Sequence, residues 1–348
     1  MGFLEIKLTL INNLCYLNSI SKKANKRVYM PLFDDKVKCE FIKPETEGLL
    51  VIVPQTNFNT FEWIKENKSL LEDYLIKFGG IILRNFGIYS VSEFNKAVQI
   101  LCPNLLDYVY RSTPRTKLGG KIYTATEYPA DRTIPLHNEN SYSNLWPTKI
   151  FFFSVIVASE GGETPIADSR RVYKRIDNSI REKFEQKGIL YVRNYNPGID
   201  LSWQDVFQTD QKELVNKYCQ DNNIEFEWKK SGPELTTKQV CQATIVHPIS
   251  RVPVWFNQAH LFHISALEEN DRISLIKELG EENLPRNTFY GDGQPIEIEV
   301  LNHIREVYNQ EKIKFQWQKG DIMMLDNILT AHARETYKGE RKVAVAMA

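Results

Sequence analysis

The chain has 348 residues, of which 42% are hydrophobic and 25% are charged, so a globular fold with a substantial core is expected. This composition excludes a disordered, collagen-like or disulfide-scaffold protein. Lysine plus arginine and aspartate plus glutamate both total 44, and this balance argues against bulk binding to nucleic acid or to an anionic membrane.

The chain carries no sign of export or of membrane insertion. No apolar run reaches the roughly 18 residues of a membrane span, and the first residues lack the pattern of a signal peptide. The five cysteines are widely spaced without a C-x-x-C pair, so neither a disulfide framework nor a zinc knuckle is indicated. We expect a cytoplasmic protein without nucleic-acid or membrane partners.

The first half of the chain predicts an extension that leads into one domain. Residues 1–45 show no sustained period and are interpreted as an N-terminal extension, and residues 46–348 as a single catalytic domain. Apolar residues recur at helical spacing over 60–78, and glycines 79–80 end this helix before a buried strand. A capping box opens a further helix over 90–101.

The remaining chain alternates short strands with helices. Strands are predicted at 121–128, 149–159, 224–228, 243–248, 252–257, 314–318, 321–326 and 341–348. Helices are predicted at 169–186, after a box at 210–213, at 265–279 and at 296–308. Many short strands with inserted helices indicate an α+β fold, either a β-sandwich or a barrel-like jelly roll with helical cover.

The segment IPLHNENSY contains the most informative histidine. His137 and Glu139 are two residues apart and would share one face of an extended segment. A facial triad of two histidines and one carboxylate needs a third ligand from another strand, and His332, after the strand DIMMLD, is the candidate. The H-x-E pattern alone is also typical of an ordinary polar strand end.

Two further features fit a site that binds a dicarboxylate. Thr164 follows the glycine turn at 161–162 and could present its hydroxyl to a carboxylate, although a plain hairpin turn is the alternative. Arg341 lies nine residues beyond His332 and could bind a carboxylate through two parallel hydrogen bonds. Arg334 competes for this role, and a surface arginine is the alternative for Arg341.

The chain resembles the TauD/TfdA superfamily of iron(II), 2-oxoglutarate-dependent dioxygenases from about Phe78 to the end, and is most similar to the SyrP-like branch of nonribosomal peptide biosynthesis. The resemblance is carried by LHNENSY, WPTKIFFF, GGETPIADSRRV, WFNQAHLFH, LPRNTFYGDG and GDIMMLDNILTAHARETYKGERKVAVAMA. It implies a double-stranded β-helix (jelly roll) with helical cover and insertions. It also implies Fe(II), 2-oxoglutarate and O2 as cofactor and co-substrates.

The resemblance implies a role for each matching residue. His137, Glu139 and His332 would be the iron ligands, Thr164 would contact the C1-carboxylate end of 2-oxoglutarate, and Arg341 would bind its distal carboxylate. Glu139 favours hydroxylation or desaturation over chlorination, because the related halogenases carry a small residue in place of the carboxylate.

By the same resemblance, the substrate is an amino acid, free or tethered to a peptidyl carrier protein, that is hydroxylated at an unactivated C–H. Five residues are candidates for substrate contact from their place in the sequence alone, and a structural role is equally open for them: Tyr123, Glu127, Asn140, Asn257 and His260. A zinc-dependent hydrolase with the same three ligands, and a binding protein without catalysis, are alternative functions.

A basic cluster precedes these residues in the chain. Arg111, Arg115, Lys117 and Lys121 could contact an acidic carrier protein, or could simply form a solvated loop.

Overall fold

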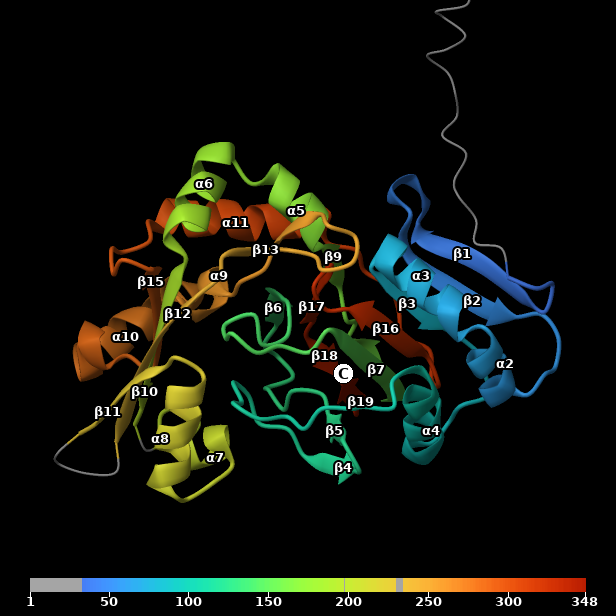
Figure 1. Ribbon diagram of the computed structural model, residues 1–348, viewed down its shortest axis with the longest axis horizontal. Coiled ribbons are helices and arrows are strands. Elements are labelled where there is room, and N and C mark those ends of the chain that lie inside the picture. The colour runs from blue at the N-terminus through green and yellow to red at the C-terminus, as the bar shows by residue number, and fades with distance from the viewer. Residues whose placement is uncertain (1–32, 197, 230–233) are drawn as a thin grey trace, which may run out of the picture.

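The computed structural model describes residues 33–348 except 197 and 230–233 (Figure 1). Most of the predicted extension therefore lies outside the described residues. Its last part contains β1 (Val37–Lys43), which pairs with β2 (Gly48–Pro54) at the edge of the largest sheet. Within the described residues, no helix is long and apolar enough to span a membrane.

The largest sheet has eight strands in the order β1-β2-β3-β16-β7-β19-β5-β4. The six not yet bounded are β3 (Gly80–Leu83), β16 (Ile322–Asp326), β7 (Lys149–Ile156), β19 (Lys342–Met347), β5 (Ile122–Thr124) and β4 (Lys117–Gly119). All neighbours are antiparallel except β2 and β3, which are parallel. Strands from both ends of the chain thus meet in one sheet.

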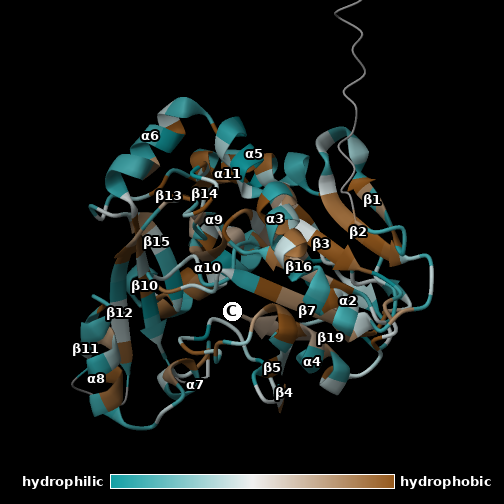
Figure 2. Cartoon of the chain, turned by 45° about the vertical axis from the view of Figure 1, so that its right-hand side comes forward, coloured by the Kyte–Doolittle hydropathy of each residue, from teal (hydrophilic) through white to brown (hydrophobic). Residues whose placement is uncertain are grey.

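Side chains of β7 alternate between the two faces of this sheet, as a strand dictates. Phe151 and Phe153 pack beneath the helices on one face, whereas Ile150 and Phe152 belong to the core on the other face. Because both faces are covered, the strands are apolar on both sides, and Figure 2 shows β2 and β3 largely in the hydrophobic colour.

Three helices cover the outer face of the large sheet: α2 (Thr60–Glu66), α3 (Lys68–Phe78) and α4 (Val91–Leu101). The single helix predicted over 60–78 is interrupted at Asn67. The predicted end at Gly79 is confirmed, and this glycine adopts the left-handed conformation. The predicted capping box of α4 is confirmed, with Ser90 and Glu93 each bonded to the other's backbone.

A smaller sheet lies against the inner face and has the order β6-β17-β9, with β6 (Ile134–His137), β17 (Thr330–Arg334) and β9 (Ile166–Asp168). A two-stranded ladder of β8 (Glu160–Gly161) and β18 (Tyr337–Lys338) continues beside it. These short strands carry the polar residues that the sequence singled out.

A third region is inserted between β9 and β16. Its sheet has the order β11-β12-β10-β15, with β11 (Glu225–Trp228), β12 (Leu235–Cys241), β10 (Ile189–Tyr195) and β15 (Arg286–Tyr290). A hairpin joins β13 (Thr244–Val246) to β14 (Pro253–Trp255). The helices are α5 (Ser169–Arg175), α6 (Asn178–Lys187), α7 (Trp203–Phe207), α8 (Lys212–Asp221), α9 (Ala259–Phe262), α10 (Glu269–Leu279) and α11 (Ile298–Glu311).

Three further element predictions were wrong in detail. The helix predicted over 169–186 is two helices, because Ile176 is extended between α5 and α6. Residues 314–318 form no strand, although Phe315 and Trp317 are buried. Gln211, not Asp210, is the N-cap of α8 and makes no side-chain cap.

Candidate metal centre

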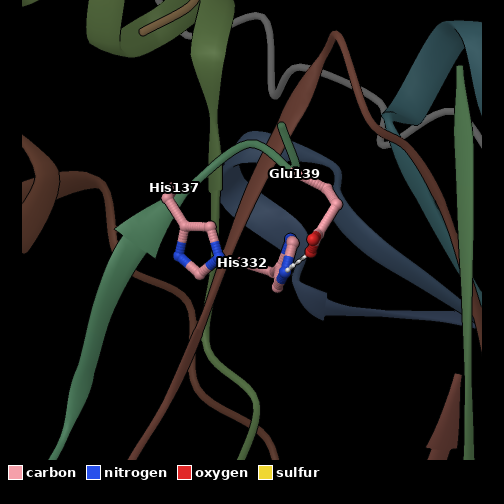
Figure 3. A group of neighbouring side chains, drawn as sticks. All are labelled: His137, Glu139 and His332. Carbon is pink, nitrogen blue, oxygen red and sulfur yellow. Dashed lines mark ion pairs between the residues drawn. The ribbon is translucent and has the colours of Figure 1, made fainter. Parts of the chain in front are cut away.

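Cross-strand pairing brings the two predicted histidine ligands together. His332 on β17 is the register partner of His137, the last residue of β6, and their ring centroids are 4.5 Å apart (Figure 3). Glu139 lies in the turn after β6, followed by Asn140 at φ +55°, so it does not share a strand face with His137 as the sequence predicted. The turn, not strand alternation, directs the carboxylate toward the histidines.

The three side chains have the donor set of a metal site. One ligand atom from each of His137, Glu139 and His332 lies within 4.8 Å of the others, and His332 Nε2 is 3.6 Å from Glu139 Oε2. The Nδ1 of His137 is 2.8 Å from the carbonyl oxygen of Pro135, and donation there leaves its Nε2 lone pair for a metal. Two imidazoles and one carboxylate suit ferrous iron.

Burial and neighbouring charges keep His137 and Glu139 in their metal-binding forms. Burial, with His332 next to it, lowers the pKa of His137 to about 3, so this imidazole is neutral at physiological pH. Burial by itself would raise the pKa of Glu139, but Arg115 and the two histidines outweigh it and hold that pKa well below its usual range. A neutral histidine and an ionised carboxylate bind a metal without first losing a proton.

Asn327 fixes the backbone around Glu139. Its Oδ1 accepts the Glu139 N–H at 2.7 Å, and its Nδ2 donates to the Glu139 carbonyl at 3.0 Å and to the Pro147 carbonyl at 2.8 Å. Asn138 donates to the Asn327 carbonyl at 2.7 Å. The connection between β16 and β17 therefore holds the turn that carries the carboxylate ligand.

A second polar group lies beside the metal ligands. The Nε of Arg341 donates to the Gly162 carbonyl at 2.8 Å, and its Nη2 donates to the Thr164 hydroxyl oxygen at 3.3 Å. The indole N–H of Trp317 donates to the same oxygen at 3.0 Å. With both lone pairs of that oxygen engaged, the Thr164 proton is available for an incoming anion. We call Thr164, Arg341 and Trp317 the anion group.

Arg334 has a different environment from Arg341. Its guanidinium donates to the carbonyls of Tyr128 and Pro129 at 2.7 and 2.6 Å, and also to that of Arg132. These three bonds hold the loop before β6. Arg341 has fewer internal partners, so it has more hydrogen-bonding capacity left for a ligand.

One cavity joins the two histidine ligands to Thr164 and Arg341 of the anion group. Arg115, Arg334 and Thr126 also line it. The rest of the wall is apolar and consists of Ala125, Ile134, Phe152, Ala333 and Val345. The cavity therefore offers a metal site and an anion site with apolar surface between them.

Within the described residues, none of the five predicted substrate-contact residues lines this cavity. Tyr123 is buried and its hydroxyl donates to Asp107 at 3.1 Å, whereas Glu127 is exposed and accepts from Thr124. Asn140 accepts from the Tyr142 hydroxyl at 3.2 Å. Each of the three has a partner within the protein.

The other two candidates also make internal bonds. Asn257 is fully buried, donates to the Ala243 carbonyl and accepts the Ala259 N–H. The Nε2 of His260 lies 2.9 Å from the carbonyl oxygen of Leu136, the residue before His137. These contacts favour the structural alternative for both residues.

The basic cluster is not a continuous surface patch, which corrects that part of the sequence interpretation. Arg115 is buried and its Nη2 donates to Glu139 Oε2 at 2.8 Å. Arg111 donates to the Tyr108 carbonyl, and Lys117 and Lys121 both lie near Asp107. Burial of Arg115 removes it from any contact with a carrier protein.

The fold and the site together define a class of protein. The chain matches the family described as "Taurine catabolism dioxygenase TauD, TfdA family" over residues 43–347. It therefore belongs to the TauD/TfdA family and is an Fe(II)/2-oxoglutarate-dependent dioxygenase, with Fe(II), 2-oxoglutarate and O2 as the cofactor and co-substrates of that class. The family prediction is confirmed, and the two alternative functions are not retained.

Two proteins are similar to the chain in sequence over most of its length. The dapdiamide synthesis protein DdaC of Enterobacter agglomerans is 45% identical over 277 residues, which cover 80% of this chain and 84% of DdaC. A clavaminate synthase-like protein of Arabidopsis thaliana is 29% identical over 294 residues, covering 82% of this chain and 86% of that protein.

A solved structure shares the fold. PvcB, described as an Fe, alpha-ketoglutarate dependent oxygenase from an isonitrile synthetic pathway, matches with a TM-score of 0.54 at 13% identity, covering 91% of this chain and 92% of PvcB. AAD-2, solved with Mn(II) and N-oxalylglycine, matches with a TM-score of 0.53 at 13% identity, covering 90% of this chain and 96% of AAD-2. These likenesses place the mixed sheets and helices of the chain in a known fold.

Sequence reasoning missed three residues that support the site. Arg115 was interpreted as part of a basic cluster and Trp317 as part of a strand, and Asn327 was not singled out. No local motif marks them, because each acts on a residue far away in the sequence.

Proposed function

We propose that this dioxygenase hydroxylates an unactivated C–H of an amino acid, free or tethered to a peptidyl carrier protein, in specialised metabolism. The observation that carries the proposal is the single cavity that joins the histidine ligands to the anion group. The 45% identity to a dapdiamide synthesis protein supports a place in the biosynthesis of a specialised metabolite.

We propose that the eight-stranded sheet and the β6-β17-β9 sheet are the two sheets of a double-stranded β-helix. The helices α2 to α4 then form the helical cover, and the region between β9 and β16 is the insertion. The catalytic domain over 46–348 remains our division of the chain, with β1 adding an edge strand from the predicted extension.

In this proposal His137, Glu139 and His332 hold the iron, which when bound supplies oxygen activation coupled to decarboxylation of 2-oxoglutarate. The anion group binds the distal carboxylate of 2-oxoglutarate. Because the Thr164 hydroxyl is only 3.3 Å from Arg341 Nη2, both residues suit one carboxylate. This arrangement favours a shared role over the C1-carboxylate contact that the resemblance implies for Thr164.

The apolar wall has its own part in the reaction. Phe152, whose ring centroid lies 5.0 Å from that of His332, packs beside the ligands, and Ile134 and Val345 line the same cavity. These side chains exclude water from the ligands and strengthen the electrostatic contacts between the anion group and its carboxylate. A substrate C–H held against this wall would be positioned for oxidation, and side reactions with solvent would be suppressed.

An anaerobic titration of metal-free protein with Fe(II) and 2-oxoglutarate tests the cofactor assignment. We expect the weak visible charge-transfer band of the chelate in wild-type protein and its loss in His137→Ala. His303→Ala is the matched control, because His303 lies on α11 and contacts Asp177 away from the cavity. Absence of the band from well-folded wild-type protein would overturn the assignment.

A substrate assay tests the finer proposal. The iron-loaded protein is incubated with 2-oxoglutarate, oxygen and either free amino acids or the same amino acids as thioesters on a carrier protein. We expect succinate release coupled to a product 16 mass units heavier, as the addition of one oxygen atom requires. Products that are two mass units lighter would show desaturation, and succinate release without any change in either substrate set would refute the proposed class.

A further inference from the structure

Arg115 makes an ion pair with the carboxylate that completes the metal site. Its Nη2 lies 2.8 Å from Glu139 Oε2, and both side chains are only 4% exposed. Among the described residues, Glu139 is the one ionic partner of Arg115. A guanidinium does not lose its proton in a protein, so the arginine side of this ion pair does not depend on pH.

The surroundings of Arg115 hold the guanidinium in place. Its central carbon lies 4.4 Å from the ring centroid of the buried Tyr108, a cation–π distance. Next to it in the chain, Thr116 exchanges two hydrogen bonds with Thr124 on β5, each 2.8 Å long. The arginine is therefore anchored to the large sheet and not to the turn that carries Glu139.

The oxygen that Arg115 holds is also the one that faces another metal ligand. Glu139 Oε2 accepts from Arg115 Nη2 at 2.8 Å and lies 3.6 Å from His332 Nε2. The bond to Arg115 therefore fixes the direction in which the carboxylate faces the histidines. An outer partner that orients a ligand in this way contributes to the affinity of a site for its metal.

We propose that Arg115 is a positioning residue that holds the Glu139 carboxylate in the orientation that completes the metal site. This inference rests on the proposed iron and 2-oxoglutarate site. It gives the arginine a function that no sequence motif marks, and it assigns the segment before β4 to the metal centre.

Anaerobic Fe(II) titration of Arg115→Met tests the proposal without measuring turnover. We expect a rise of about 10- to 100-fold in the Fe(II) dissociation constant, the usual cost of losing an outer partner of a metal ligand. We also expect a weaker or shifted chelate band with 2-oxoglutarate. Arg115→Lys keeps the charge and a donor, so it should restore part of the Fe(II) affinity and part of the chelate band.

A double-substitution cycle separates positioning from simple support of the fold. In the Glu139→Ala background, Arg115→Met should no longer weaken Fe(II) binding, because the residue through which Arg115 acts is gone. Arg193→Met is the matched control: Arg193 is buried, donates to the Arg111 carbonyl and does not line the cavity. It should lower the unfolding midpoint and leave the Fe(II) constant unchanged.

The outcomes are distinguishable. An equal loss of Fe(II) affinity in both backgrounds, or a loss equal to that of Arg193→Met, would overturn the positioning role. A rise only in the 2-oxoglutarate constant would assign Arg115 to the co-substrate instead and would also overturn it. If wild-type protein forms no Fe(II)–2-oxoglutarate complex, the proposed function itself fails, whereas an unchanged Arg115→Met variant refutes this inference alone.

Discussion

Arg341 and Arg334 lie seven residues apart near the same cavity, yet their hydrogen bonds differ. Three loop carbonyls surround the Arg334 guanidinium, whereas Arg341, directly before β19, bonds to Gly162 and Thr164. Burial, together with the charge of Arg334, lowers the pKa of Arg341 to about 10, so Arg341 remains charged at neutral pH. A dicarboxylate would relieve the repulsion between the two cations.

Arg341→Met should therefore raise the 2-oxoglutarate concentration at half-saturation by about 10- to 100-fold, since a charge-assisted hydrogen bond contributes roughly 1.5–3 kcal/mol. This concentration is measured from the intensity of the chelate band as 2-oxoglutarate is added. Arg334→Met should instead lower the unfolding midpoint and change the 2-oxoglutarate constant little. If Arg334→Met raised the 2-oxoglutarate constant more than Arg341→Met, Arg334 would be the residue that binds the carboxylate.

Trp317 should affect the dissociation constant of 2-oxoglutarate through its hydrogen bond to Thr164. Trp317→Phe keeps most of the buried ring and removes the donor to the Thr164 hydroxyl, so 2-oxoglutarate binding should weaken about two- to tenfold. Trp228→Phe is the control, since its indole bonds to Asn216 in the insertion. An equal change of the 2-oxoglutarate constant in both variants would mean that the Thr164 contact is unimportant.

The sequence allowed the ligand and anion-binding residues to be nominated but not their supporting residues. His137 and Glu139 sit within one short motif, and Arg341 follows His332 closely, so local spacing was informative. Arg115 is separated by 24 residues from Glu139, Trp317 by 153 from Thr164 and Asn327 by 188 from Glu139. Contacts at such separations depend on sheet order, which spacing does not reveal.

At the scale of elements, the glycine turn between β8 and β9 shapes the anion group. Gly162 has φ +73°, and a Cβ there would lie 2.9 Å from Arg341 Cδ. The turn was predicted, but its contact with Arg341 was not, because β8 pairs with β18 and not with a sequence neighbour. Helix ends were predicted well where a glycine or the Ser90–Glu93 box marks them, and poorly at Asn67 and Ile176, where neither does. The box predicted at 210–213 does not cap α8.

Gly162→Ala should displace the Arg341 side chain and weaken 2-oxoglutarate binding by at least about tenfold, with a stability loss of roughly 1–2 kcal/mol. Gly293→Ala is a matched control: Gly293 has φ +84° and no atom within 4 Å of an added Cβ. Calorimetric titration and urea unfolding of both variants separate the two effects. Similar 2-oxoglutarate constants for both variants would contradict this role of Gly162.

At the scale of the whole molecule, buried histidines make stability depend on pH. Burial lowers the pKa of His260 to about 4 and that of His263 to about 4, with Arg305 adding to the effect at both. In the unfolded chain an imidazole takes up a proton near pH 6.5. The unfolded state therefore binds more protons between pH 6.5 and 4, and stability falls as the pH falls through that window.

For His260 alone this loss should be on the order of 3 kcal/mol between pH 6.5 and 4. Urea unfolding of the metal-free protein at several pH values, with a chelator present, measures it. In His260→Gln, which can still donate to the Leu136 carbonyl, the slope of stability against pH should be shallower by about one proton. An unchanged slope would show that His260 is protonated in the folded state.

The order of strands in the large sheet also governs how the chain can fold while it is being made. Between β3 and β5 stand β16, β7 and β19, so residues 322–326 and 342–347 fill the middle of a sheet whose outer strands are synthesised far earlier. On the ribosome, β3, β7 and β5 must wait with unpaired edges until residues 322–347 emerge. His332 and Arg341 arrive in that same stretch, so folding during synthesis cannot produce a working site early, and the nascent chain depends on protection from aggregation until then.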